Sequence, residues 1–256
     1  MKKFGLIQVA AAPVRASDSD TAEIVTQLLF GEAIELIADG NPWVKIRCQH
    51  DGYEGYMDTK QIEYLSDSEY THWKTLPKTR LTQHCIQLQS PDGPEWIFRG
   101  AFLPSSSPES GFRLGSRSYE VLHFPKELAR NTNSIETAMG YLNTPYLWGG
   151  RSVTGIDCSG YTQIVFAFMG VDLLRDASQQ ATQGETVDFA DSKPGDLAFF
   201  HNTKGKIIHV GILTGTGTIL HASGKVREDQ FDQSGIFRKD LNKYTHNLTL
   251  IRRYFK

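Results

Sequence analysis

The spacing of apolar residues changes near residue 126, and this change limits the folds open to the chain. Before it, short runs such as AIELIA and WVKIRC alternate in polarity or carry β-branched residues, which is typical of strands. After it, apolar residues recur at steps of three and four, which is typical of helices. The pattern therefore predicts β structure first and an α+β arrangement afterwards.

The first half contains two groups of strand-like runs. Residues 1–66 hold several short runs separated by Gly and Asp turns, and the pair Asp51-Gly52 after WVKIRC is a strong hairpin signal. Such spacing predicts a small barrel. Residues 67–125 hold CIQLQSPDGPEWIFRGAFL, in which Ser-Pro-Asp-Gly-Pro predicts a turn between two strands. A second β unit is therefore expected there.

The remaining residues, 126–256, predict helices followed by strands. The segment PKELARNTNSIETAMGYL has helical spacing, and an amphipathic helix is expected after Cys158, with Gly170 as its end. The segments SKPGDLAFFH, KIIHVGILT and TILHAS then follow turn signals and predict strands. A short helix pair with an antiparallel sheet is the expected result.

Composition excludes several classes of protein. The net charge is −2 and no run of Lys or Arg exceeds two residues, so nothing indicates binding to nucleic acid or to an anionic membrane. No apolar run reaches the length of a membrane span. The three cysteines, Cys48, Cys85 and Cys158, are scattered and odd in number, which excludes a disulfide framework and favours a reducing compartment.

The first residues bear on localisation. The segment MKKFGLIQVAAAPVRA resembles a secretory signal in its lysines and small residues, but its apolar part is short and is interrupted by Gln8. We therefore expect LIQVAAAPV to be a first strand and the protein to be cytoplasmic. Export is the alternative if residues 1–16 are a signal peptide.

The hexapeptide GIDCSG, residues 155–160, carries the strongest chemical signal. Asp157 is a good N-cap, which places Cys158 in the first turn of the helix. Unpaired N–H groups and the helix dipole there are expected to lower the pKa of the thiol. The same N–H groups could receive an oxyanion. Cys158 is therefore placed as a nucleophile, whereas Cys48 and Cys85 fit the alternative of inert structural cysteines.

A nucleophilic thiol needs a base, and two histidines on successive strands could supply it. His209 and His221 are joined by a segment containing TGTGT. A three-residue loop at 215–217 would put Gly211 opposite His221 and His209 on the same face, and a loop one residue longer or shorter would separate them. One imidazole could then take the thiol proton while the other orients it. A zinc site at Cys158, His209 and His221 is a weaker rival, because no short-spaced ligand pair organises it.

These residues resemble a known family. The segment TPYLWGGRSVTGIDCSGYTQIVFAFMG, followed by KPGDLAFF, HVGIL and ILHAS, is similar in order and spacing to the NlpC-type cell-wall cysteine peptidases. The resemblance covers roughly residues 127–256. It implies a reduced papain-like α+β domain that hydrolyses amide bonds of peptidoglycan peptides, with no metal or organic cofactor.

The resemblance also implies roles for individual residues. Cys158 matches the nucleophile, His209 the base and His221 the residue that orients the base. Tyr146 matches a tyrosine that helps to hold the oxyanion. Three further positions match residues that line the substrate cleft: Trp148, Asp157 and Ser159.

The two β units resemble bacterial SH3-like barrels. Two such barrels before the peptidase domain resemble the γ-D-glutamyl-L-diamino acid endopeptidases of murein-peptide recycling, in which the barrels narrow the cleft. In that subgroup a carboxylate binds the free amine of an N-terminal L-Ala, and Asp176 is the matching residue. A solvated Asp or a helix N-cap is the equal alternative for Asp176.

The expected partners are therefore small murein peptides of the form L-Ala-γ-D-Glu-diamino acid, and a monomer is expected although the sequence does not give the oligomeric state. Two other functions stay open. The chain could be a non-catalytic module that binds cell-wall peptides, or an amide acyltransferase on the same Cys-His scaffold. Products formed in the presence of amine acceptors would distinguish transfer from hydrolysis.

Overall fold

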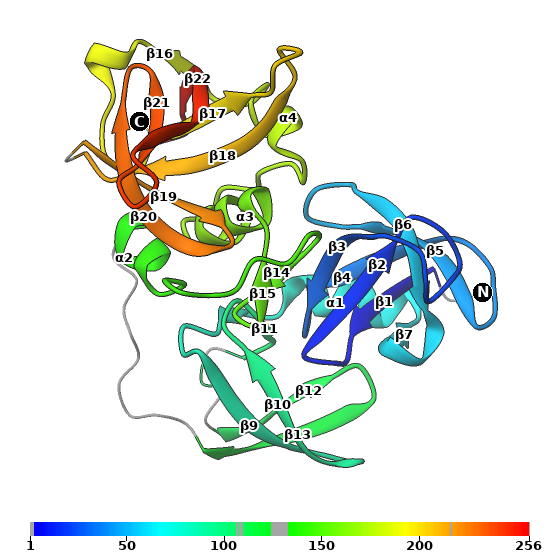
Figure 1. Ribbon diagram of the computed structural model, residues 1–256. Helices are drawn as coiled ribbons and strands as arrows, with labels where there is room; N and C mark the ends of the chain where they lie inside the picture. The colour runs from blue at the N-terminus through cyan, green and yellow to red at the C-terminus, as the bar shows by residue number, and fades with distance from the viewer. Residues whose placement is uncertain (1–2, 106, 108–109, 124–132, 216, 256) are drawn as a thin grey trace. The chain divides into compact units, whose positions relative to one another are not determined.

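The computed structural model describes residues 3–105, 107, 110–123, 133–215 and 217–255 (Figure 1). The chain divides into two compact units, Met1–Arg130 and Asn131–Lys256. The domain boundary predicted at residues 125 and 126 lies outside the described residues. None of the helices among the described residues has the length and apolar character needed to span a bilayer.

The first unit opens with a barrel-like sheet of seven strands. Its strands are β1 (Phe4–Ile7), β2 (Ala11–Arg15), β3 (Ile24–Leu29), β4 (Ala33–Ala38), β5 (Trp43–Cys48), β6 (Glu54–Asp58) and β7 (Ile62–Leu65). Their spatial order in the sheet is β3-β2-β6-β5-β4-β1-β7. A 3-10 turn, η1 (Thr59–Gln61), precedes β7. The segment expected as one strand is divided, because β1 pairs with β4 and β7 whereas β2 pairs with β3 and β6.

The hairpin predicted at Asp51-Gly52 is confirmed. It joins β5 to β6, which pair in antiparallel register. Gly52 has a φ of +73°, a conformation that glycine adopts without steric cost. The Asp51 carboxylate accepts a hydrogen bond from the Tyr53 backbone N–H at 2.9 Å, which is the local bond that makes Asp favourable in turns.

A helix that was not predicted follows this sheet. Helix α1 (Asp67–Thr75) starts at a capping box, in which Ser66 accepts from the Glu69 N–H and Glu69 accepts from the Ser66 N–H. The pattern Ser-x-x-Glu was therefore present in the sequence as a helix-start signal. The boundary expected between residues 66 and 67 falls at this cap.

The second group of strands lies after α1. A four-stranded sheet has the order β10-β9-β13-β12, and β8 pairs with β11. The strands are β8 (Thr79–Arg80), β9 (Cys85–Ser90), β10 (Gly93–Phe98), β11 (Phe102–Leu103), β12 (Phe112–Leu114) and β13 (Arg117–His123). The turn predicted between the two runs of residues 85–98 is confirmed, since Gly93 pairs with Ser90. One core joins both sheets of the unit, with the Phe30 ring packed edge-on against Phe112 and Tyr119.

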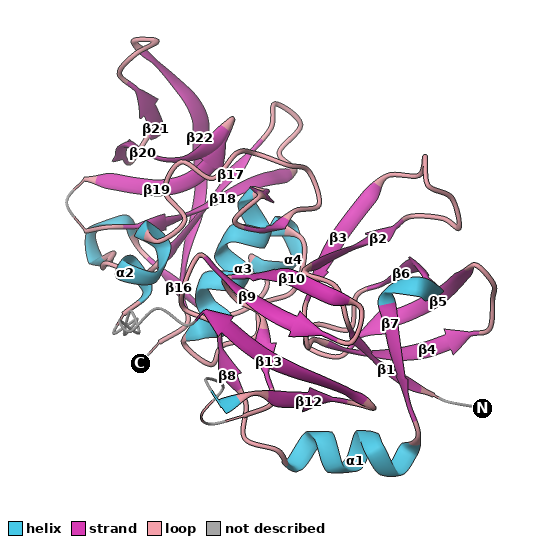
Figure 2. Ribbon diagram, turned by 90° about the horizontal axis from the view of Figure 1, so that it is seen from below, coloured by secondary structure: helices cyan, strands magenta, loops and turns pink. Residues whose placement is uncertain are grey.

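The second unit is α+β, as predicted (Figure 2). Its helices are α2 (Ser134–Met139), α3 (Cys158–Phe168) and α4 (Ala177–Gln180), with a 3-10 turn η3 (Phe189–Asp191). A short hairpin, β14 (Arg151–Ser152) and β15 (Gly155–Ile156), precedes α3. The strands of the main sheet are β16 (Glu185–Val187), β17 (Leu197–His201), β18 (Ile207–Leu213), β19 (Thr218–Ser223), β20 (Lys225–Asp232), β21 (Gly235–Arg238) and β22 (Lys243–Arg253).

The main sheet of this unit closes on itself. Its order is β16-β22-β17-β18-β19-β20-β21, and β22 also pairs with β21. Strands β17 to β22 therefore form a ring in which β22 touches both β17 and β21. Helix α3 packs against β18 and β19 (Figure 1), which brings the start of the helix beside the strands that carry the two predicted histidines.

The glycines around Cys158 allow close packing of the chain. A Cβ at Gly160 would lie 2.2 Å from the Gly150 carbonyl oxygen, and one at Gly150 would lie 2.4 Å from the Gly155 carbonyl oxygen. Real Cβ atoms do not approach backbone oxygens so closely. The glycines of GIDCSG and of the preceding WGG thus let residues 149–151 lie directly against the start of α3.

We therefore expect Gly160→Ala to destabilise the protein by about 1–3 kcal/mol, the usual cost of overpacking a tight site. Gly52→Ala is a comparison for backbone strain without a close contact, because nothing lies within 4 Å of its Cβ position but its φ is +73°. Denaturant unfolding of the whole chain measures both variants. Equal stability of Gly160→Ala and the unchanged protein would contradict the packing argument.

Candidate active site

Helix α3 begins at Cys158, as predicted. Asp157 has extended backbone angles, and its carboxylate accepts from the Gly160 N–H at 2.6 Å. Cys158 is therefore the first helical residue, and its side chain is 5% exposed. The backbone N–H groups of Ser159 and of Val210 in β18 bond the sulfur. These bonds tie the sulfur to the strand residue that directly follows His209.

The prediction of a low pKa for the Cys158 thiol is wrong. Burial raises the pKa of Cys158 to about 12, and the charge of Asp157 raises it further. The N–H groups of Val210 and Ser159 and the Arg175 charge oppose this shift without cancelling it. Removal of water penalises a thiolate more strongly than the first turn of one helix stabilises it. The resting sulfur is therefore a neutral thiol.

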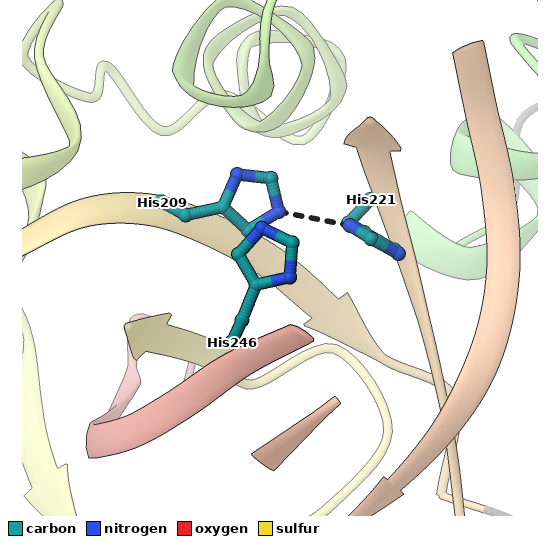
Figure 3. Close-up of side chains that lie close together, drawn as sticks. All are labelled: His209, His221 and His246. Atoms are coloured by element: carbon teal, nitrogen blue, oxygen red, sulfur yellow. Dashed lines mark hydrogen bonds between the residues drawn. The ribbon is translucent and has the colours of Figure 1, made fainter. Parts of the chain in front are cut away.

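The hairpin of β18 and β19 has the predicted register. Gly211 pairs with His221, and the Thr214 N–H donates to the Thr218 carbonyl oxygen. The loop is thus residues 215–217, of which Thr216 lies outside the described residues. His209 and His221 consequently lie on one face, where His209 Nε2 and His221 Nδ1 share a hydrogen bond of 2.8 Å (Figure 3).

Burial also keeps both imidazoles neutral. Burial lowers the pKa of His209 well below its ordinary value, and the charges of His221 and His246 lower it further. The pKa of His221 is lowered by burial as well, although Asp229 opposes the shift. In Figure 3 the second ring nitrogen of His209, Nδ1, lies on the side turned away from His221. This nitrogen therefore takes no part in the hydrogen bond with His221.

Two residues of this cluster were missed by the sequence analysis. Asp229 on β20 accepts a hydrogen bond at 2.9 Å from His221 Nε2. His246 on β22 stacks on His209, with ring centroids 4.2 Å apart and planes inclined by 24° (Figure 3). Asp229 lies in a strand that pairs with β19, and only the sheet topology places it behind His221. His246 arrives through the ring closure of β22.

The three histidines are arranged for hydrogen bonding rather than for a metal. Their nearest nitrogens lie within 4.8 Å of one another. The 2.8 Å between His209 Nε2 and His221 Nδ1 is shorter than the roughly 3.3 Å that tetrahedral zinc imposes with bonds of about 2.0–2.1 Å. The rings of His246 and His209 also stack almost in parallel. Their nitrogen lone pairs therefore point in parallel planes and not toward one common metal position.

A buried ion pair holds the segment around Cys158. The two oxygens of Asp157 accept from Arg175 at 3.1 and 2.5 Å, and Oδ2 also accepts from the Gly149 N–H at 2.8 Å. Arg175 donates to Ser159 Oγ at 2.9 Å as well. Asp157 and Ser159, predicted to line the cleft, thus direct their side chains into the domain and hold the helix start. Arg175 was not predicted.

The other predicted binding residues lie at the edges of this centre. Tyr146 forms a bridge with Ile156, and its pKa is raised well above the ordinary value by burial first and then by the nearby Cys158 and Asp157 charges. Trp148 is 60% exposed. Asp176 is the N-cap of α4, and its N–H donates to Gln179 Oε1 at 3.0 Å. The helix-cap alternative for Asp176 is therefore observed.

Comparisons with known proteins agree with this architecture. A model of the NlpC/P60 family matches residues 143–246, and a model of the bacterial dipeptidyl-peptidase SH3 domain matches residues 14–62. The chain is similar in fold to the crystal structure of an NlpC/P60 family protein from Bacillus cereus. The TM-score is 0.79, the identity is 22%, and the match covers 98% of this chain and 99% of that one.

Two curated relatives extend the similarity in sequence. A gamma-D-glutamyl-L-lysine dipeptidyl-peptidase of Bacillus subtilis is 32% identical over 85% of this chain and 79% of its own length. A protein of the same name from Bacillus cereus is 27% identical over 78% of this chain and 67% of its own length. Together with the fold and the two domain matches, this similarity shows that the chain belongs to the NlpC/P60 family of cell-wall cysteine peptidases.

Proposed function

We propose that this peptidase hydrolyses the γ-D-glutamyl–diamino acid amide bond of murein peptides that begin with a free L-Ala. The observation that carries the chemistry is the buried thiol of Cys158 at the start of α3, tied by the Val210 N–H to the strand that presents His209. The names of the two relatives, which both specify a γ-D-glutamyl-L-lysine bond, support the choice of substrate.

Attack begins from the neutral pair. The sulfur of Cys158 bonds to the carbonyl carbon of γ-D-Glu while the thiol proton passes to Nδ1 of His209. The carbonyl becomes an oxyanion, which would accept hydrogen bonds from the Cys158 backbone N–H at the start of α3 and from the Tyr146 hydroxyl. Donors that are already oriented toward the oxyanion limit the reorganisation that accompanies the step.

The intermediate then collapses to products. The protonated His209 gives its proton to the amine of the diamino acid, and this amine leaves as the C–N bond breaks. The remaining thioester joins Cys158 to L-Ala-γ-D-Glu. Water attacks the thioester with His209 as its base, which releases the dipeptide and restores the neutral thiol.

Asp176 is our candidate for the group that binds the L-Ala ammonium. It lies one residue from Arg175, whose guanidinium binds the Asp157 carboxylate beside Cys158. The residue is only partly buried, and a carboxylate facing an ammonium forms a charge-assisted hydrogen bond. A peptide held by its free amine would present its second amide bond to the sulfur.

We further propose that the peptidase acts in the cytoplasm on recycled peptides. Residues 4–15 contain β1 and β2 of the first sheet, so the segment that resembles a signal peptide is part of a folded core. All three cysteines are free thiols, which suits a reducing compartment. Cell fractionation with an antibody against the native protein tests this location, and recovery outside the cytoplasm would contradict it.

Replacement of the nucleophile should abolish activity. We expect Cys158→Ala to lower kcat on L-Ala-γ-D-Glu-L-Lys and on its diaminopimelate counterpart by the order of 10⁶-fold, because no other group can form the thioester. Cys85→Ala is the control, since Cys85 is an exposed free thiol. Mass spectrometry of the products, with and without added amine acceptors, measures cleavage and detects any transfer. Cleavage by Cys158→Ala at the normal rate would contradict the mechanism.

The free amine of the substrate should matter. We expect N-acetylation of the tripeptide to lower kcat/KM by about 10- to 100-fold, the equivalent of one lost charged hydrogen bond. Asp176→Asn should reduce this preference, whereas Asp172→Asn, at an exposed neighbouring position, should leave it unchanged. Equal cleavage of both peptides by the unchanged enzyme would exclude an amine-binding site.

The pH dependence should follow His209. Its protonated form cannot accept the thiol proton, so kcat/KM should fall as the pH drops through the pKa of His209. Because burial lowers that pKa below 6.5, the half-maximal acidic pH should lie below 6.5 and the rate should be level near neutral pH. A pH–rate profile, with circular dichroism at each pH to exclude unfolding, measures this. A midpoint above 6.5 would show that the ring is not held in the buried environment.

A further inference from the structure

A chain of hydrogen bonds leads from the candidate base to a buried carboxylate. His209 Nε2 bonds His221 Nδ1 at 2.8 Å, and His221 Nε2 bonds Asp229 Oδ2 at 2.9 Å. His221 has no exposed surface, and Asp229 is 8% exposed. Each ring nitrogen in this chain therefore has one partner and no access to bulk water, so the position of every proton is set by the neighbouring group.

The carboxylate determines which nitrogens carry protons. An ionised carboxylate only accepts hydrogen bonds, so His221 Nε2 must be the protonated nitrogen of that ring. The other nitrogen of a neutral His221, Nδ1, is then an acceptor. His209 Nε2 must consequently donate to it, which leaves Nδ1 of His209 with its lone pair. That nitrogen is the one turned away from His221 (Figure 3).

We propose that Asp229 is a positioning residue, which acts through His221 to hold His209 in the tautomer whose Nδ1 can accept the Cys158 proton. The inference rests on the proposed function only in taking His209 as the base. It adds Asp229 as a fourth member to the set formed by Cys158, His209 and His221.

The charges around Asp229 keep it ionised. Burial alone would raise the pKa of Asp229, but hydrogen bonds from His221 and Arg227 outweigh burial and lower it below the ordinary value. Arg227 Nη2 donates to Asp229 Oδ1 at 2.7 Å. The Arg238 charge lowers the pKa of His221, and the His246 charge lowers the pKa of His209. Asp229 is thus the one carboxylate in hydrogen-bond contact with the histidine pair among the described residues.

The same carboxylate stabilises the protonated base. When His209 takes the thiol proton, its positive charge can be shared along the two hydrogen bonds toward Asp229. In a buried site such a charge is costly unless it has a partner. Asp229 therefore favours both the correct neutral tautomer before attack and the imidazolium after it.

Asp229→Asn tests this with little change in shape. An amide cannot accept from both His221 and Arg227 in the manner of the carboxylate, because one of its two ends is a donor. With the NH₂ toward His221, the proton pattern reverses and His209 Nδ1 becomes the protonated nitrogen. We expect kcat/KM for the tripeptide to fall between about 10²- and 10⁴-fold, the usual contribution of a general base.

Asp240→Asn is the matched control. Asp240 binds Arg227 at 3.4 Å and Arg238 at 3.1 Å. Within the described part of the chain it forms no hydrogen bond or ion pair with His221, and its side chain is half-exposed. It thus removes a carboxylate from the same ion cluster without touching the histidine pair. We expect it to keep the activity within about twofold, as surface ion pairs contribute little. An equal loss in both variants would overturn the positioning role.

The pH–rate profile of Asp229→Asn separates positioning from simple loosening. Without the carboxylate, the acid limb of the pH–rate profile should move to lower pH, because an imidazolium without its anion is less stable. Loosening that admits water would move the limb upward, since burial is the main cause of the low His209 pKa. An upward shift would overturn the inference. The other titratable or charged groups around the histidine pair are unchanged in Asp229→Asn; they are Cys158, Arg227, Arg238 and His246.

A second readout, the protonation pattern of the two rings, needs no substrate and no variant. Two-bond ¹H–¹⁵N spectra of the unchanged protein should show both His209 and His221 protonated at Nε2. A proton on Nδ1 of either ring would overturn the inference even if Asp229→Asn fails to fold.

The rate of alkylation of Cys158 by iodoacetamide, measured in a Cys85→Ser background, should be lower in Asp229→Asn and unchanged in Asp240→Asn. If the tripeptide is not cleaved while these results hold, the proposed substrate fails and the role of Asp229 stands.

Discussion

The buried carboxylate of Asp157 holds together the three pieces of chain that surround the thiol. It caps α3 through the Gly160 N–H, fixes the glycine turn through the Gly149 N–H and binds both terminal nitrogens of Arg175. Loss of one partner of such a buried pair leaves an uncompensated charge, which costs about 3–5 kcal/mol. The position of Cys158 therefore depends on an ion pair that does not itself take part in proton transfer.

Cys158 and His209 are both neutral because they are buried. Burial raises the thiol pKa to about 12 and lowers that of the neighbouring imidazole, so both groups are uncharged at rest. The charge separation needed for attack then has to be provided when the substrate arrives. The fixed N–H groups at the sulfur and the carboxylate behind His221 are placed at the two ends of that separation. Burial and catalysis are therefore compatible only because polar partners are already in position.

The sequence predicted those parts of the site that depend on residues close together in the chain. The N-cap at Asp157 and the three-residue loop at 215–217 fixed the start of α3 and the shared face of His209 and His221. Asp229, Arg175 and His246 were missed because strand pairing and long-range packing, rather than spacing, bring them in. The prediction of a low thiol pKa was wrong for a similar reason. A helix start can be recognised in the sequence, whereas the depth to which the thiol is buried cannot. Helix α1 was missed although Ser66 and Glu69 form a capping box, which is a helix-start signal in the sequence.

The ring closure by β22 has a consequence for how the second unit behaves at high concentration. Open sheets present unpaired N–H and C=O groups along their outer strands, and these groups can template aggregation with another chain. Because β22 pairs with both β17 and β21, the strands that carry the histidines have neighbours on both sides. In the part of the chain that the structure describes, β16 lies beside the ring as a strand of three residues beginning with a charged glutamate. Such a short, charged edge offers another copy of the protein little to pair with.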